Sequence, residues 1–149
     1  PDIVITPAGG GGLASGTALG ISGTINCPVY SAEPATFDDT KRSLESGERQ
    51  SVADGAQSIC DALLSPTPGE ITFPINHRLL AGGLSVTDDE ALDAMKIAML
   101  SFKIIVEPGG AVALASALTG KLDLAGKTVV VVCSGGNVDP EMLARALAR

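Results

Sequence analysis

Three stretches of the chain are apolar almost throughout and predict buried strands. They are residues 2–6 (DIVIT), 27–33 (CPVYSAE) and 127–137 (KTVVVVCSGGN). Segments between and after them mix apolar with small or polar residues and predict helices, at 13–22, 38–50, 84–102, 107–120 and 139–149. Buried strands that alternate with helices are typical of a parallel sheet. We therefore expect an α/β fold in which a parallel sheet is flanked by helices.

The helix predicted at 84–102 carries the clearest signals. Thr87 and Glu90 have the spacing of a capping box, in which two side chains close the first turn of a helix. Four apolar side chains then share one helical face: Leu92, Met95, Met99 and Phe102.

Glycine and proline set the other boundaries. The helix within 107–120 is expected to start after Gly109-Gly110 and to end at Gly120. The last helix has Asp139 as its N-cap and Pro140 at its first position. The prolines of residues 63–76 predict loops and short pieces instead of regular structure.

Composition limits the partners of the chain. With 149 residues, 45% of them hydrophobic, it can bury a core, but its net charge of −7 offers no basic surface for nucleic acid. No apolar stretch reaches the roughly 18–20 residues of a membrane span, and no signal peptide is recognisable. The three cysteines are widely spaced and are expected to be small buried residues: Cys27, Cys60 and Cys133. A reducing, cytoplasmic compartment fits this pattern best.

The segment TPAGGGGLASG (residues 6–16) is the main chemical signal. A glycine-rich turn between a strand and a helix exposes backbone amides that bind anions, above all phosphate. A P-loop is excluded because no lysine follows the glycines. A nicotinamide-binding fingerprint remains possible, with Gly9, Gly11, Ala14 and the acidic Glu33. A cup for pyridoxal phosphate needs only several free amides, which four adjacent glycines supply.

Three later segments favour the cofactor cup. AEPATFDD (32–39), VEPGGAVALAS (106–116) and CSGGNVD (133–139) follow the glycine segment in this order. Together the four resemble the fold-type II pyridoxal-phosphate enzymes, in particular the threonine/serine dehydratase and serine racemase family. The resemblance covers essentially the whole chain. It implies β-elimination of a hydroxy amino acid such as threonine or serine to a 2-oxo acid and ammonia, with serine racemization or 3-hydroxyaspartate elimination as alternatives.

The resemblance also implies a set of cofactor-binding residues. The cofactor phosphate would be held by Gly9, Gly10, Gly11, Gly12 and the Leu13 amide. Ser134 would bond the pyridine nitrogen, Glu107 would lie near the ring edge, Asn137 would support the turn, and Gly55 would line the cofactor face. Without the resemblance, Ser134 is an ordinary serine in a turn and Glu107 a carboxylate at a helix N-terminus.

A divalent-cation site is implied in AEPATFDD. Its ligands would be the carboxylates of Glu33 and Asp39 and the backbone carbonyl of Phe37, where relatives more often carry a small residue. Oxygen ligands of this kind suit Mg²⁺ or Ca²⁺. The alternative is a solvated acidic loop that caps the helix after it.

The family's lysine, which forms a Schiff base with the cofactor, has no counterpart among the lysines of this chain. In the family it lies before the glycine loop, and none of the chain's lysines sits in such a motif: Lys41, Lys96, Lys103, Lys121 and Lys127. We therefore expect residues 1–149 to be the C-terminal part of a large cofactor domain, with the small domain and the lysine segment outside it. The resemblance implies a homodimer. A nicotinamide-binding domain and a non-catalytic phosphate-binding domain are the remaining alternatives.

Overall fold

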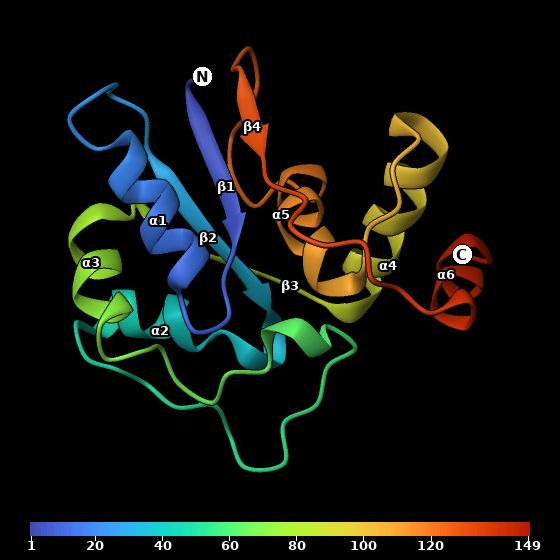
Figure 1. The fold of residues 1–149 in the computed structure, drawn as a ribbon, viewed down its shortest axis with the longest axis horizontal. Helices are drawn as coiled ribbons and strands as arrows, with labels where there is room; N and C mark the ends of the chain where they lie inside the picture. The colour runs from blue at the N-terminus through green and yellow to red at the C-terminus, as the bar shows by residue number, and fades with distance from the viewer.

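A four-stranded parallel sheet forms the centre of the computed structural model, which describes residues 1–149 (Figure 1). Its order is β3-β2-β1-β4, and every neighbouring pair is parallel. The strands are β1 (Ile3–Pro7), β2 (Val29–Pro34), β3 (Gly82–Val86) and β4 (Val129–Val131). The expected α/β fold with a parallel sheet is confirmed.

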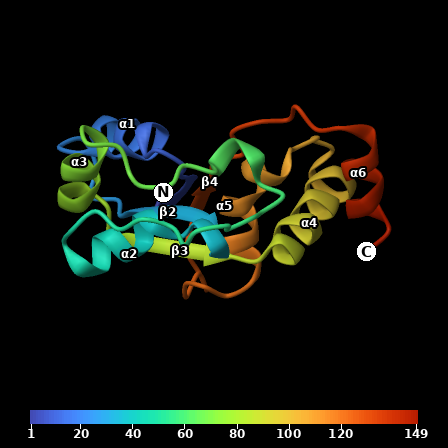
Figure 2. The ribbon, with the colours of Figure 1, turned by 90° about the horizontal axis from the view of Figure 1, so that it is seen from below.

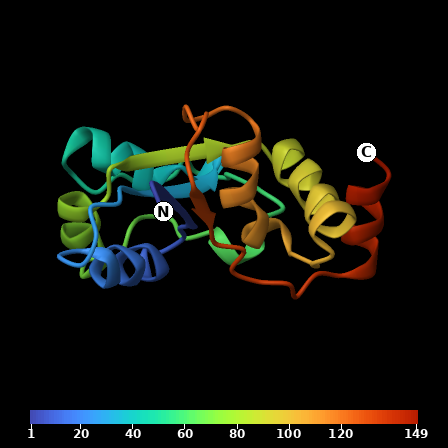
Figure 3. The ribbon, with the colours of Figure 1, turned by 90° about the horizontal axis from the view of Figure 1, so that it is seen from above.

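Helices cover both faces of the sheet (Figures 2 and 3). Because side chains alternate along a strand, Ile3 and Ile5 pack on one face, whereas Val4 packs on the other. The face of Val4 is covered by α1 (Gly12–Ile21), α2 (Asp39–Ser46) and α3 (Thr72–Leu79). The face of Ile5 carries α5 (Pro108–Leu118), then α4 (Asp88–Ile97) and α6 (Pro140–Leu147). The sheet therefore lies between two groups of helices.

The prediction of irregular structure for 63–76 is wrong for its last part. A 3₁₀ turn, η2, covers Asp61–Leu63, and α3 begins at Thr72. Pro74 is the third residue of α3, where the helix needs no amide hydrogen from it. The proline therefore fits inside the first turn.

The single helix predicted at 84–102 is also wrong at both ends. Residues 82–86 form β3, and the capping box of Thr87 and Glu90, which is confirmed, starts α4. After Ile97 the chain makes a π-helical turn over 98–102. This turn changes the helical phase, so Leu92 and Met95 are buried but Phe102 is 57% exposed. The next helix starts at Pro108, before the glycine pair.

The buried strand predicted at 127–137 is shorter and more exposed than expected. Only Val129–Val131 is a strand, and Val130 is 43% exposed because β4 lies at the edge of the sheet. Cys27 and Cys60 are buried as expected, whereas Cys133 is only partly buried. Pro140 is the first residue of α6, as predicted. None of the helices has the length and apolar character that crossing a membrane requires.

Candidate functional site

The carboxyl ends of the parallel strands bring two sequence-predicted loops to the same edge of the sheet. β1 and β4 are neighbours, with Ile5 paired to Val131 and the Val132 amide donating to the Ile5 carbonyl at 3.0 Å. The glycine loop (residues 8–12) follows β1, and the loop of residues 132–137 follows β4. Ligands of parallel α/β sheets bind at such an edge.

The glycine loop presents a row of free backbone amides. The amides of Gly9 and Gly10 find no acceptor within the chain, nor does that of Gly11, the N-cap residue of α1. Those of Gly12 and Leu13 lie in the first turn of α1, where the helix offers no acceptor. Free amides at a helix N-terminus form an anion site.

Two polar side chains of α3 contact this loop, and sequence reasoning missed both. Thr72 Oγ1 donates to the Gly10 carbonyl at 2.5 Å, and Asn76 Nδ2 donates to the Gly11 carbonyl at 3.3 Å. A polar pair four residues apart, which a helix places on one face, was the available signal. The prolines around it concealed the helix.

Glu107 and the loop after β4 hold one another. The Glu107 carboxylate accepts a hydrogen bond from the Asn137 amide at 2.8 Å, and the Glu107 amide donates to the Gly135 carbonyl at 3.0 Å. The side chain therefore does not cap its own helix, although Glu107 is the N-cap residue of α5. Ser134 is exposed in the same loop.

The turn η2 connects these two parts of the edge. A Cβ on Gly9 would lie 3.3 Å from Leu63 Cα, and one on Gly109 would lie 3.2 Å from Leu63 Cγ. Leu63 thus packs against both the glycine loop and the start of α5. The structure brings together the predicted phosphate cup, Glu107, Ser134 and Asn137 along one edge.

Gly55 lies apart from this group. It is exposed in a left-handed turn with φ +76° and lines a separate open hollow between residues 35–42 and 51–56. No other predicted cofactor residue lines that hollow.

The predicted metal ligands are largely buried. Glu33 is fully buried and accepts hydrogen bonds from the amides of Thr40 at 2.9 Å and Lys41 at 2.8 Å, so it caps α2. This burial raises the pKa of Glu33 to about 8, although these hydrogen bonds oppose the shift. Burial likewise raises the pKa of Asp39 to about 6.

One carboxylate oxygen of this group has no partner. Asp39 Oδ2 is buried without a hydrogen-bond partner, and such an atom is costly unless an ion, water or proton satisfies it. Phe37 is also buried, and its side chain contributes no ligand atom. No group of three or more His, Cys, Asp or Glu side chains is arranged for a metal. The alternative predicts a solvated acidic loop that caps the next helix. Glu33 does cap α2, but it is fully buried and therefore not solvated.

The buried Glu33 also argues against the nicotinamide alternative. In that fingerprint the acidic side chain bonds the ribose of the cofactor. Here both carboxylate oxygens face amides of α2, and the side chain has no exposed surface.

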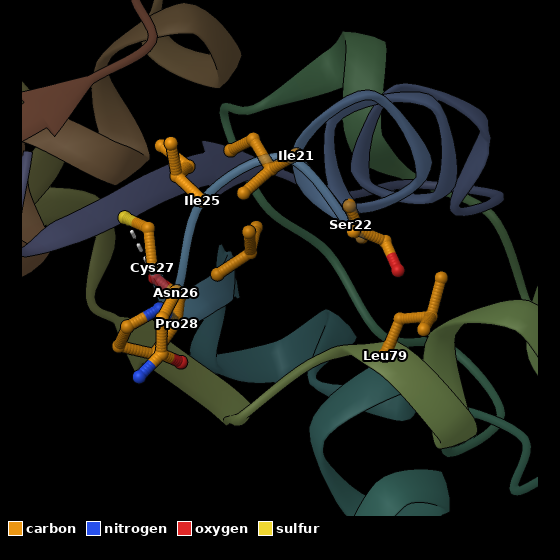
Figure 4. Close-up of a pocket in the computed structure, with 10 residues that line it drawn as sticks. Ile21, Ser22, Ile25, Asn26, Cys27, Pro28 and Leu79 are labelled. Carbon is orange, nitrogen blue, oxygen red and sulfur yellow. Dashed lines mark hydrogen bonds between the residues drawn. The ribbon is translucent and has the colours of Figure 1, made fainter.

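The cavity in Figure 4 lies at the other end of the strands, beside the amino end of β2. It measures about 320 Å³ and is formed by the end of α1, the residues leading into β2, and Leu79. Six of its ten lining residues are hydrophobic, and Cys27 is its only titratable side chain. It therefore offers a single thiol and no pair of groups for acid–base chemistry.

The lysines lie elsewhere. Lys121 pairs with Glu90 of α4 at 3.0 Å, Lys103 donates to the Leu100 carbonyl, and Lys41 Nζ faces Ser85 of β3. Lys96 lies in α4, and Lys127 precedes the amino end of β4. No hydrogen bond or ion pair joins any of them to the glycine loop.

Comparison with known proteins agrees with this arrangement. The chain is 43% identical to the serine racemase of Dictyostelium discoideum over 98% of its length, and 38% identical to the β-hydroxyaspartate dehydratase of Paracoccus denitrificans over 95%. The solved structure of maize serine racemase matches 99% of the chain with a TM-score of 0.86 and 31% identity. The chain spans about half the length of these proteins, at 46%, 45% and 48%. Residues 1–135 match the family described as "Pyridoxal-phosphate dependent enzyme", and the chain belongs to this family.

Proposed function

We propose that the enzyme to which this chain contributes eliminates water from a β-hydroxy amino acid, with threonine or serine as substrate. Hydrolysis of the unsaturated amino acid that is released then takes up water and gives a 2-oxo acid and ammonia. The observation that carries this proposal is the row of free amides in the glycine loop, on the same sheet edge as Ser134 and Glu107. Relatives named for this chemistry, and for serine racemization, support it.

The residues of this edge have distinct roles in the proposal. The amides of the glycine loop bind the cofactor phosphate, and the Ser134 hydroxyl bonds the pyridine nitrogen. Pyridoxal phosphate, when bound, withdraws electrons from the α-carbon of an amino acid. A neutral hydroxyl does not force a proton onto the ring nitrogen, which suits elimination better than transamination. Glu107 fixes the loop of Ser134 through the Asn137 amide.

Racemization of serine and elimination from 3-hydroxyaspartate are the alternative activities. Both begin with removal of the same α-proton, and the relatives include proteins named for each. The residues described above serve all of these reactions equally.

We further propose that residues 1–149 form the C-terminal part of the large cofactor domain of a cytoplasmic homodimer. In this proposal the small domain and the catalytic lysine come from sequence before Pro1. The exposed edge of β4 supports a further protein contact beside it. A run of exposed apolar side chains also supports such a contact: Leu100, Phe102, Ile104 and Ile105. This run lies near the loop after β4, since the Ile105 carbonyl packs against Gly136.

We expect the 149-residue chain, mixed with pyridoxal phosphate and threonine, to form no 2-oxobutanoate. The reason is that no lysine of the chain lies at the glycine loop to bond the cofactor and take the α-proton. A coupled dehydrogenase assay of 2-oxo acid measures this, with an intact threonine ammonia-lyase as positive control. An extended chain that includes a lysine before Pro1 should be active, and threonine, serine and 3-hydroxyaspartate as substrates then separate the alternatives. Turnover by the 149-residue chain would contradict the role assigned to the outside lysine, and an inactive extended chain would contradict the proposed function.

We also propose that Asp39, Glu33 and the Phe37 carbonyl bind Mg²⁺ or Ca²⁺, which would satisfy Asp39 Oδ2. We expect either cation to raise the melting temperature, because a ligand at 100 times its dissociation constant stabilises the folded state by about 2.7 kcal/mol. Asp39→Asn should abolish the rise, whereas Asp54→Asn, at an exposed position, should retain it. Equal melting temperatures with the cation and with EDTA would refute the site.

A further inference from the structure

The glycine loop is held from one side by two side chains of α3, and a side chain of α1 supports one of them. Thr72 and Asn76 of α3 bond the carbonyls of Gly10 and Gly11, and the Gly69 amide adds a second bond to the Gly10 carbonyl at 3.1 Å. Asn76 is fully buried, and its Oδ1 accepts a hydrogen bond from Ser15 Oγ of α1 at 2.9 Å. Ser15 thereby fixes which end of the Asn76 amide faces the loop.

These contacts determine where the loop amides point. A trans peptide unit holds its carbonyl and the following amide hydrogen on opposite sides, and the chain contains no cis peptide. With the Gly10 carbonyl directed at α3, the Gly11 amide hydrogen points away from α3. The Gly11 carbonyl accepts both the Ser15 amide of α1 at 2.9 Å and Asn76 Nδ2, so the Gly12 amide hydrogen points away from these donors. Both amides therefore lie on the side where an anion can approach.

The loop and α3 are so close together at Gly11 that no side chain fits there. A Cβ there would lie 2.6 Å from Asn76 Nδ2 and 2.9 Å from Thr72 Oγ1, and Gly11 has φ +90°. Glycine at this position thus allows both the left-handed backbone and the approach of α3.

We propose that Thr72, Asn76 and Ser15 form a carbonyl clamp, a set of positioning residues that turns the loop amides toward the phosphate of the cofactor. This inference rests on the proposed function, because it takes the cofactor phosphate as the anion of the glycine loop. The clamp acts on the phosphate end alone, so it should govern how strongly the protein prefers pyridoxal phosphate to pyridoxal, which lacks the phosphate.

The test compares Asn76→Asp with Asn26→Asp by titration with pyridoxal phosphate and with pyridoxal. Aspartate has the shape of asparagine but cannot donate to the Gly11 carbonyl, and it brings a negative charge beside the anion site. We expect Asn76→Asp to weaken binding of pyridoxal phosphate about tenfold or more, because the Gly11 carbonyl then keeps only its bond from the Ser15 amide and a like charge stands beside the anion site. Pyridoxal should bind as before. Asn26 is exposed and remote from the loop, so Asn26→Asp should bind both compounds like the unaltered chain.

Thr72→Val provides a second, milder variant. It removes only the hydroxyl that bonds the Gly10 carbonyl, and we expect a loss of about three- to tenfold for pyridoxal phosphate alone. Circular dichroism verifies that each variant is folded. The clamp is overturned if Thr72→Val and Asn76→Asp keep the unaltered preference for pyridoxal phosphate, or lose both compounds equally. An unaltered chain that shows no preference for pyridoxal phosphate over pyridoxal contradicts the proposed phosphate cup itself.

Discussion

Gly110→Ala should lower the free energy of unfolding by about 1–3 kcal/mol, although alanine normally stabilises a helix relative to glycine. A Cβ on Gly110 would lie 2.5 Å from the Gly135 carbonyl oxygen and 2.9 Å from the Gly135 nitrogen. Both are backbone atoms of the loop that carries Ser134, so they cannot move aside as a flexible side chain can. The loop must shift as a whole, which also disturbs the bond from the Asn137 amide to Glu107.

Gly16→Ala is the matched control for this substitution. Gly16 lies within α1, and a Cβ there would meet nothing within 4 Å beyond the backbone of its own helix. Alanine should therefore raise the free energy of unfolding by about 0.5–1 kcal/mol. Urea unfolding followed by circular dichroism measures both variants. If Gly110→Ala is as stable as Gly16→Ala, α5 and the loop after β4 are not packed as closely as described.

The free energy of unfolding should fall as pH rises from about 5 to about 8. Burial raises the pKa of Glu33 from 4.5 to about 8 in the folded chain. Between these values the folded state keeps a proton that the unfolded state loses, so increasing pH favours unfolding. At about 1.36 kcal/mol for each pKa unit, the effect is on the order of 4 kcal/mol. Asp39 acts in the same sense, because burial raises its pKa from 3.8 to about 6.

Urea unfolding between pH 4 and 9 in EDTA tests this dependence. Glu33→Gln cannot ionise, so it should remove the decline between pH 6 and 8 and leave the part below pH 6 that Asp39 causes. Glu45→Gln, at an exposed position of α2, should keep the full decline. Constant stability of the unaltered chain from pH 5 to 8 would mean that Glu33 is ionised in the fold.

Local patterns in the sequence predicted much of the fold. Apolar runs placed β1 and β2, and the capping box marked the start of α4, because these signals act within a few residues of one another. β3 was missed because Gly82 and Gly83 lack strand-forming side chains; a Cβ on Gly83 would lie 2.6 Å from Lys41 Cα. Gly83 of β3 leaves room for α2, which packs against it.

The candidate site likewise combines features that a local pattern predicted with contacts between distant residues that it did not. The free amides of the glycine loop were predicted, and so was the acidic residue of VEPGG, because both lie in short contiguous segments. The bond of Glu107 to the Asn137 amide spans 30 positions, and those of Asn76 to Ser15 and Gly11 span 61 and 65. A contact across such a separation depends on how helices pack on the sheet, which no local pattern encodes.

The sequence by itself determined the α/β class, the glycine loop at the start of a helix, and the resemblance to a pyridoxal-phosphate family. These depend on residue types at short spacing, where backbone preferences and burial act directly. Only the tertiary structure decided that α3 holds the loop carbonyls, that Glu33 is buried against α2, and that β4 is an exposed edge. Each of these depends on which element lies beside another, and packing across the sheet sets that arrangement.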